Sequence, residues 1–358
     1  MPSLENIADI IHTWLNITFN STTALLIELV IVAVSAIGLF SMLGLILIMM
    51  ERKVSAYMQV RLGPNRVGPK GMFQTVADTL KLMVKEGMTP NGADKFLFNL
   101  APFIVMIVAM VILAPLAFAK NFQLWDLNIG ILFVASVSSV SVIGILMAGW
   151  ASNNKYSLLG AMRSGAQIVS YELSAGLSII TIVILTGSLK ISTIIQSQSD
   201  GWWIFKGHIP ALIAFVIFII AVTAETNRAP FDLAEAESEL TAGFHTEYSG
   251  MKFALFFLAE YVNIFIVCVL GATLFLGGWM PLHFGTDTRF NELMDYIPSS
   301  LWLFGKTFFL IFIIMWFRWT FPRLRIDQLL NLEWKYLLPI SMFNLLLTTL
   351  MAIMGWHF

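Results

Sequence analysis

The segment from Glu225 to Glu239 holds the densest group of ionisable side chains in the sequence. Its fifteen residues include five carboxylates and one arginine, in the order Glu-Thr-Asn-Arg-Ala-Pro-Phe-Asp-Leu-Ala-Glu-Ala-Glu-Ser-Glu. Apolar runs long enough to cross a bilayer flank it on both sides. Acidic side chains beside hydrocarbon are expensive, and those that persist there commonly handle protons or cations. The alternative is an acidic loop whose solvated charges keep it out of the lipid.

Glu172 and Glu260 lie deeper, inside two of the apolar runs. A charge at the centre of a spanning helix costs roughly 2.5–3.5 kcal/mol on insertion scales, so such acids are candidate functional residues. At 1.5 Å per residue, Glu260 lies about 13 Å inside its run. Glu225 ends the preceding run on the same side of the membrane. These three carboxylates would therefore connect the acidic loop with the bilayer interior.

The loop acids are close enough in sequence to titrate together. On a helix, Glu235 and Glu239 stand one turn apart, where like charges repel. Crowding and burial both raise carboxyl pKa values, and the protons then come and go as a coupled set. A proton relay leading through Glu260 to Glu172 would begin at the loop acids Asp232, Glu235, Glu237, Glu239 and Glu247.

Two further ionisable residues allow two interpretations each. His245, among the loop acids, could titrate near neutral pH or could be an ordinary surface residue. Glu28 lies near the outer end of the first apolar run and can reach the interface, so a structural role fits it at least as well.

The composition predicts an all-α polytopic membrane protein. The chain is 58% apolar and 12% charged, with a mean hydropathy of +0.81, whereas soluble domains carry about 25% charged residues. Connections between the apolar runs are too short for a separate soluble domain, so residues 1–358 form a single membrane domain. Eight spans are predicted, at about 24–50, 96–118, 130–151, 157–187, 208–225, 251–278, 300–320 and 336–355.

The basic residues orient the predicted spans. Sixteen Lys and Arg fall in the odd-numbered connections and five elsewhere, which predicts that both termini lie outside the cytoplasm. The expected location is a bacterial inner membrane, with both termini on the periplasmic side. Residues 1–23 lack a basic n-region and are taken as mature protein. Within them, Leu4, Ile7, Ile11 and Trp14 recur at helical spacing, which is typical of a helix lying in the interface.

The predicted cytoplasmic loop 51–95 opens with a basic segment, Glu-Arg-Lys-Val-Ser-Ala-Tyr-Met-Gln-Val-Arg-Leu-Gly-Pro-Asn-Arg-Val-Gly-Pro-Lys. Its two Gly-Pro pairs end any helix and impose turns. Beyond them, apolar residues from Phe73 to Val84 share one face, which predicts an amphipathic helix. The basic patch could bind lipid headgroups. The rigid turns fit a shaped pocket wall or a docking surface better.

No redox centre is predicted in this chain. The single cysteine, Cys268, lies within an apolar run and cannot form a cluster or a redox pair alone. The five histidines are scattered, with none paired at helical spacing inside a span, and no metal site is predicted. Any electron carriers would belong to a partner protein.

The motifs beginning at Glu51 and Glu225, together with Ala259-Glu-Tyr261, resemble one family over essentially the whole chain. That family is the H subunit of respiratory complex I, the proton-pumping NADH:quinone oxidoreductase, with mitochondrial NADH dehydrogenase subunit 1 as counterpart. The resemblance implies the heel of the membrane arm, where loops 51–95 and 226–250 form the wall of the quinone tunnel and an acidic funnel.

The resemblance also implies roles for individual residues. Arg52, Arg61 and Arg228 would line or brace the quinone cavity. The acids that match the family's proton pathway are Asp78, Glu172, Glu225, Asp232, Glu235, Glu237, Glu239, Glu247 and Glu260. Quinone would be the substrate, while NADH, FMN and the iron–sulfur clusters would be held by partner subunits. The implied partners are peripheral-arm and membrane-arm subunits and membrane lipids, and not nucleic acid.

Two other functions compete with this interpretation. The membrane subunit of an energy-converting hydrogenase shares the fold and lacks the quinone tunnel, and the long loop with its full acidic motif argues against it. A stand-alone proton or cation transporter is the second alternative. The chain shows no convincing internal repeat, which transporters often contain.

Overall fold

The computed structural model describes residues 12–14, 20–120, 122–234, 237–283 and 288–355. Within them, eight helices are long and apolar enough to cross a membrane, which confirms the predicted all-α polytopic fold. They are α2 (Ser21–Met58), α4 (Lys95–Ile112), α5 (Gly130–Ala151), α6 (Lys155–Thr186), α9 (His208–Glu225), α11 (Gly250–Phe275), α13 (Ser299–Thr320) and a last helix, of α14 (Ile326–Leu332), the π-helical η3 (Glu333–Leu337) and α15 (Leu338–Ile353).

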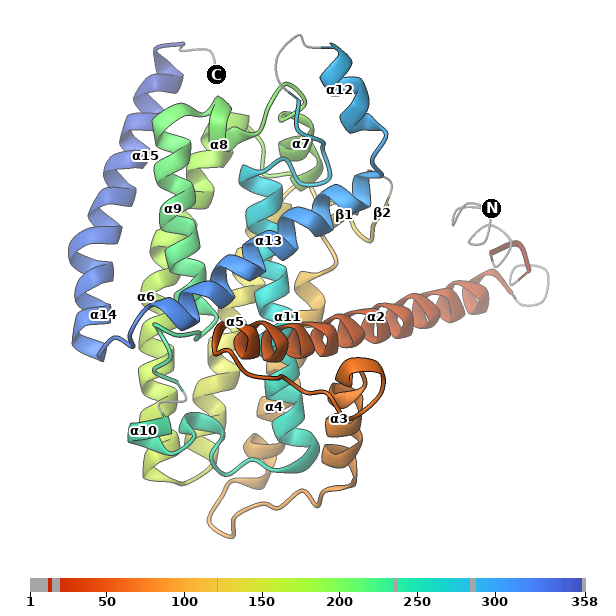
Figure 1. The fold of residues 1–358 in the computed structure, drawn as a ribbon, viewed down its shortest axis with the longest axis vertical. Coiled ribbons are helices and arrows are strands. Elements are labelled where there is room, and N and C mark those ends of the chain that lie inside the picture. The colour runs from red at the N-terminus through yellow and green to blue at the C-terminus, as the bar shows by residue number, and fades with distance from the viewer. Residues whose placement is uncertain (1–11, 15–19, 121, 235–236, 284–287, 356–358) are drawn as a thin grey trace.

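Short elements fill the connections. They are η1 (Pro69–Gly71), α3 (Gln74–Val84), the antiparallel hairpin β1 (Ala117–Ala119) and β2 (Phe122–Gln123), α7 (Ile191–Gln196), α8 (Trp203–Lys206), α10 (Glu237–Leu240), η2 (Gly243–His245) and α12 (Thr288–Asp295). The loops with α3 and α10 lie at the lower end of the molecule in Figure 1, and α7, α8 and α12 lie at the upper end.

Local chemistry sets the helix ends. The Asp94 carboxylate accepts from the amide of Phe96 at 3.0 Å and begins α4, and Asn154 does the same for α6 through Tyr156 at 2.9 Å. Gly187 ends α6 in a left-handed conformation at φ 66°.

The central helix of the bundle is α11. Residues 264–275 are all buried, and α11 packs against α2, α4 and α13. The other close pairs are α4 with α5, α5 with α6, and α6 with α9. In Figure 1, α6, α9, α11 and α15 run nearly vertically, whereas α2 crosses them almost at right angles.

Three helices begin or end well away from their predicted limits. The first continues to Met58 and does not end near residue 50, because Glu51 and Arg52 find partners within the bundle and the Gly-Pro turns come only later. The second, predicted to reach residue 118, ends at Ile112, and residues 117–119 form the strand β1 instead. The last begins at Ile326, ten residues before the predicted span, because α14 and η3 precede α15 without a break.

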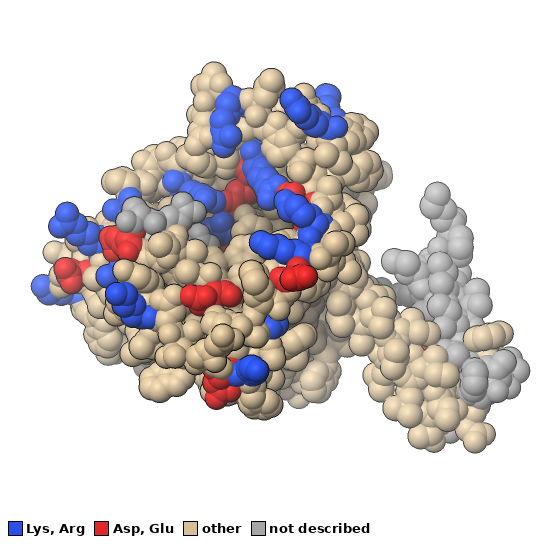
Figure 2. Space-filling view, turned by 90° about the horizontal axis from the view of Figure 1, so that it is seen from below, with Lys and Arg blue, Asp and Glu red and all other residues tan. Residues whose placement is uncertain are grey.

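The amphipathic helix expected after the Gly-Pro turns is α3. The expected interfacial helix near the N-terminus falls outside the described residues, apart from residues 12–14. Charged side chains of both signs gather on the lower end of the molecule, the face that carries the loops with α3 and α10 (Figure 2).

Candidate functional site

Three carboxylates meet in the interior of the bundle. Glu260 and Glu225 line one cavity, and Glu225 and Glu172 line a second. The cavities share the side chains of Ser138 and Asn263, so they adjoin each other. Their volumes are about 40 and about 50 Å³. Since a water molecule needs roughly 10–15 Å³ measured in this way, each cavity has room for a few.

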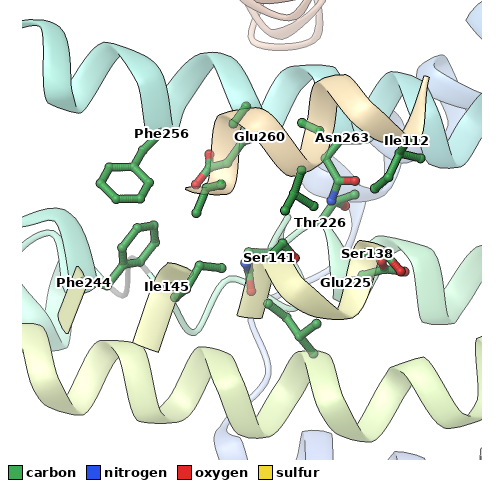
Figure 3. A pocket seen from close by; sticks show the side chains of 16 residues that line it. Ile112, Ser138, Ser141, Ile145, Glu225, Thr226, Phe244, Phe256, Glu260 and Asn263 are labelled. Atoms are coloured by element: carbon green, nitrogen blue, oxygen red, sulfur yellow. The ribbon is translucent and has the colours of Figure 1, made fainter. Parts of the chain in front are cut away.

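Four helices bring these groups together. Glu225 is the last residue of α9, Glu172 lies midway along α6, and Ser138 belongs to α5. Glu260 and Asn263 are three residues apart on α11, so they share one face of that helix. Figure 3 shows Glu260 and Asn263 on one side of the cavity, with Ser138 and Glu225 facing them. The result is a polar line through an otherwise apolar interior.

The aromatic pair Phe244 and Phe256 closes one end of this cavity (Figure 3). The two rings are packed edge to face with centroids 5.4 Å apart. Phe244 belongs to η2, in the loop that carries the predicted acidic funnel. The loop therefore contributes one of the two apolar rings that line this end of the cavity, and α11 contributes the other.

The far end of the polar line reaches the side of the bundle. Ser139 of α5 donates a hydrogen bond to the Glu172 carboxylate, and Ser139 is exposed in the isolated chain. Glu172 is partly buried. The line of carboxylates thus runs from the loop side of α11 to an outward-facing serine.

A larger cavity, of about 420 Å³, lies between α2, α3 and α11. Arg52, Asp78 and Lys81 gather in its wall, and most of the remaining lining is apolar, with Leu45 and Leu258 among it. The Arg52 guanidinium is 2.5 Å from the Asp78 carboxylate. Although partial burial raises the pKa of Asp78, hydrogen bonds from Arg52 and Lys81 outweigh it and hold that pKa below its usual value.

A buried charge cluster joins three distant segments. Glu51 of α2, only 5% exposed, accepts from Arg228 at 3.2 Å and from Arg318 of α13. The Arg228 guanidinium also stacks over the Tyr261 ring, 4.5 Å from its centroid. Both interactions fix the start of the loop after α9 to α2 and α11. Arg228 therefore braces the bundle and lies apart from the cavity that contains Arg52.

Arg61 is placed differently from the other two predicted quinone-binding arginines. Its side chain is exposed and donates to the Gln59 side chain at 2.5 Å. It lines neither the cavity beside Arg52 nor the cluster around Glu51.

The predicted funnel acids divide into several environments. Glu239 is half exposed and pairs with Arg163 at 2.6 Å, and this hydrogen bond lowers its pKa. Glu247 accepts from the Asn154 side chain at 2.5 Å, and the Asp232 backbone carbonyl accepts from Arg323. Glu235 and the side chain of Glu237 lie outside the described residues.

His245 differs from both interpretations of it. Its ring packs between Phe244 and Phe253, with centroid distances of 4.9 and 5.2 Å. Burial lowers the pKa of His245 to about 4, so the ring is neutral at pH 7. It is neither a surface residue nor a group that titrates near neutrality.

Sequence reasoning missed several residues of the site. Asn263 follows Glu260 by one turn inside an apolar run, and that spacing could have indicated it. Glu51 is the first residue of the basic segment after the first span, and Arg318 is one of the basic residues used to orient the spans. Only their ion pair shows that they belong to one cluster. Glu333 is fully buried on η3 and accepts from Ser174 at 3.0 Å. Its place just before the last apolar run gave no sign of this burial.

Cys268 is a buried thiol in α11. Among the described residues, no three His, Cys, Asp or Glu side chains come close enough to hold a metal ion.

The site and fold can be set beside known proteins. A protein-family model described as NADH dehydrogenase matches residues 29–349. The NADH-quinone oxidoreductase H subunit of Bacteroides fragilis is 57% identical over 353 residues, covering 98% of this chain and 99% of that protein. The proteins of the same name from Bacteroides thetaiotaomicron (57%, 97% of each chain) and Brevibacillus brevis (48%, 84% and 86%) are also similar. The chain therefore belongs to the family of NADH-quinone oxidoreductase H subunits and is a membrane subunit of that oxidoreductase complex.

Proposed function

We propose that the chain forms the path by which quinone reaches the complex, and that its carboxylates couple quinone reduction to proton translocation. The observation that carries the proposal is the cavity between α2, α3 and α11, because it combines an apolar channel with a charged wall. A quinone needs the same combination, since its tail is a hydrocarbon and its headgroup accepts hydrogen bonds.

The shape of the cavity suits an amphiphile. Its α2 wall runs from Ser41 to Arg52, about 16 Å at 1.5 Å per residue. Arg52, Asp78 and Lys81 stand toward one end of this wall, and Leu45 stands toward the other. A tail lying along α2 and α11 would leave the headgroup beside the guanidinium. Arg52 then acts as a hydrogen-bond donor, and Asp78 keeps it in position.

The proton path is proposed through the three interior carboxylates. Quinone reduction takes up two electrons and two protons, which changes the charge close to the loop acids. The coupled carboxylates Glu260, Glu225 and Glu172 would redistribute their protons in response, through water in the two small cavities. Ser139 would pass a proton on to a neighbouring subunit. The loop acids, Asp78 included, would supply protons from the cytoplasmic side.

This proposal also implies where the chain lies and which partners surround it. We infer a multi-pass subunit of a bacterial inner membrane, with the face of Figure 2 on the cytoplasmic side. NADH, FMN and the iron–sulfur clusters belong to partner subunits in this scheme. The match to the H subunits over nearly the whole chain favours it over the hydrogenase subunit and the stand-alone transporter.

A pair of adjacent substitutions in α2 tests the quinone path. Leu45 lines the cavity, whereas Ile46, 43% exposed, faces outward from the same helix. Leu45→Trp should raise the KM for a long-tailed quinone about tenfold or more, because overpacking costs ~1–3 kcal/mol. Ile46→Trp should leave it unchanged. Equal kinetics for the two variants in the intact complex would rule out this cavity as the quinone path.

A further inference from the structure

Another cavity, of about 630 Å³, lies on a different side of the bundle. It is bounded by α9, α13 and the segments around Phe231 and Leu324, and it shares no lining residue with the cavity beside Arg52. Thr223 is the one lining residue with a polar side chain. We call this cavity the α9–α13 groove. It suits a purely hydrocarbon ligand.

The length of the groove matches one leaflet of a bilayer. Its walls run from Phe215 to Thr223 on α9 and from Ile313 to Phe321 at the end of α13. Eight residues of helix span ~12 Å, and half of a ~30 Å hydrocarbon core is ~15 Å. An acyl chain entering at one membrane surface would therefore end near the bilayer midplane.

Positive charge surrounds one end of the groove. Phe321, Pro322 and Leu324 line it, and Arg323 and Arg325 alternate with them along the same short segment. Arg325 is exposed, and Asp327 lies nearby in the first turn of α14. Glu239, which is paired with Arg163, also interacts electrostatically with Arg323 and Arg325. The segment therefore carries a net positive charge next to a hydrocarbon-lined slot.

Tryptophans mark the depth of this end. Trp316 and Trp319 of α13 are 51% and 38% exposed, and Trp334 of η3 is 52% exposed. Exposed tryptophans are enriched at the membrane–water interface, because the ring is largely apolar but its N–H group can bind water or headgroups. The arginines thus lie at the level of lipid headgroups.

We propose that the α9–α13 groove binds an anionic phospholipid, with an acyl chain along α9 and α13 and its phosphate beside Arg325 and Arg323. The positive rim selects an anionic headgroup, and the uncharged walls accept only the tail. This inference does not depend on the quinone or proton assignments above.

The bound lipid would support the loop after α9. Pro230 and Phe231 line the groove, and the Phe231 carbonyl accepts from the buried Gln167 side chain at 2.7 Å. Arg323 donates to the Asp232 carbonyl, so the rim and the loop are directly connected. An acyl chain in the groove would contact Pro230 and Phe231, in the same loop as Arg228.

Photolabelling of the intact, detergent-solubilised complex tests this site. The probe is a phosphatidylglycerol with a photoactivatable diazirine on one acyl chain, added after exchange of native lipid. The label should map by mass spectrometry to peptides containing residues 215–223 and 313–321. Excess unlabelled phosphatidylglycerol should displace it, and excess phosphatidylcholine should not. Equal displacement by both lipids, or labelling elsewhere only, would overturn the proposal.

Two variant pairs sharpen the test. Val216→Trp fills the groove and should abolish the label there, whereas Leu212→Trp, one turn away on the same face of α9 but outside the groove lining, should not. Arg325→Gln should weaken labelling about fivefold, since each basic residue near a membrane surface contributes about this factor in anionic lipid affinity. Arg289→Gln, on the exposed α12, should have no effect. Unchanged labelling in both Val216→Trp and Arg325→Gln, or a quinone that displaces the lipid, would show that the groove has another occupant.

Discussion

Glu51 and Arg52 are neighbours in the sequence but pair with charges on different sides of α2. Glu51 is buried against Arg228 and Arg318, and Arg52 faces the cavity where it pairs with Asp78. One turn of helix therefore connects the core of the bundle with the wall of the proposed quinone path.

The Glu51 cluster should contribute strongly to stability. Glu51→Gln removes the negative charge that two guanidiniums contact in a buried site, and breaking such a pair typically costs ~3–5 kcal/mol. The purified complex carrying it should lose this subunit at a lower temperature than wild type. Glu86→Gln, at an exposed loop position, is the control. Identical melting of the two variants would show that the cluster is not stabilising.

Glu225 should be essential for proton transfer, because it alone lines both small cavities among the three interior carboxylates. Glu225→Gln keeps the size and removes the exchangeable proton. Proton pumping in reconstituted vesicles should fall about 100-fold, in line with the loss of a positioned proton-transfer group. Glu172→Gln should act similarly, and Glu86→Gln should not. Wild-type pumping by both Glu225→Gln and Glu172→Gln would refute the relay.

The Gly-Pro turns depend on Gly71. Its φ is +78°, and an added Cβ would come within 2.1 Å of the Pro64 carbonyl oxygen. Gly71→Ala should therefore disturb the loop, with ~1–2 kcal/mol from the left-handed backbone alone and more from the clash. Faster proteolysis between residues 59 and 73 would report it. Gly87→Ala, with open space around its Cβ, is the matched control and should behave as wild type.

Acid should destabilise the loop around His245. In the unfolded chain a histidine binds a proton below pH 6.5, but His245 remains neutral until about pH 4. The unfolded state then binds more protons, so stability falls as the pH drops from 6.5 to 4, by ~3 kcal/mol in total. Hydrogen exchange of residues 243–249 should accelerate over this range. In His245→Asn the acceleration should be smaller, and equal acceleration would contradict the assignment.

The fold was largely predictable because lipid imposes simple rules. Apolar runs of sufficient length become helices, and all eight spanning helices were located from hydropathy alone. The end of α2 was not located, since its charged last turns contain Glu51 and Arg52, whose partners are more than twenty positions away. Hydropathy contains no information about such distant pairs.

The site was predictable only in part. Glu172, Glu225 and Glu260 are conspicuous as acids in or beside apolar runs, and the structure brings them together. Their order, with Glu225 in the middle, depends on how α6, α9 and α11 pack. The separation of Arg52, Arg61 and Arg228 into three environments also follows from packing, since all three look alike as basic residues near a membrane surface.

The contact between Ser139 and Glu172 restricts what can surround this chain. Both side chains are polar. Ser139 is exposed on the flank of the bundle and Glu172 is partly exposed, where acyl tails of lipids could form no hydrogen bond with them. In the proposed relay, a neighbouring polypeptide with a polar group at the same level adjoins this flank and takes up the proton.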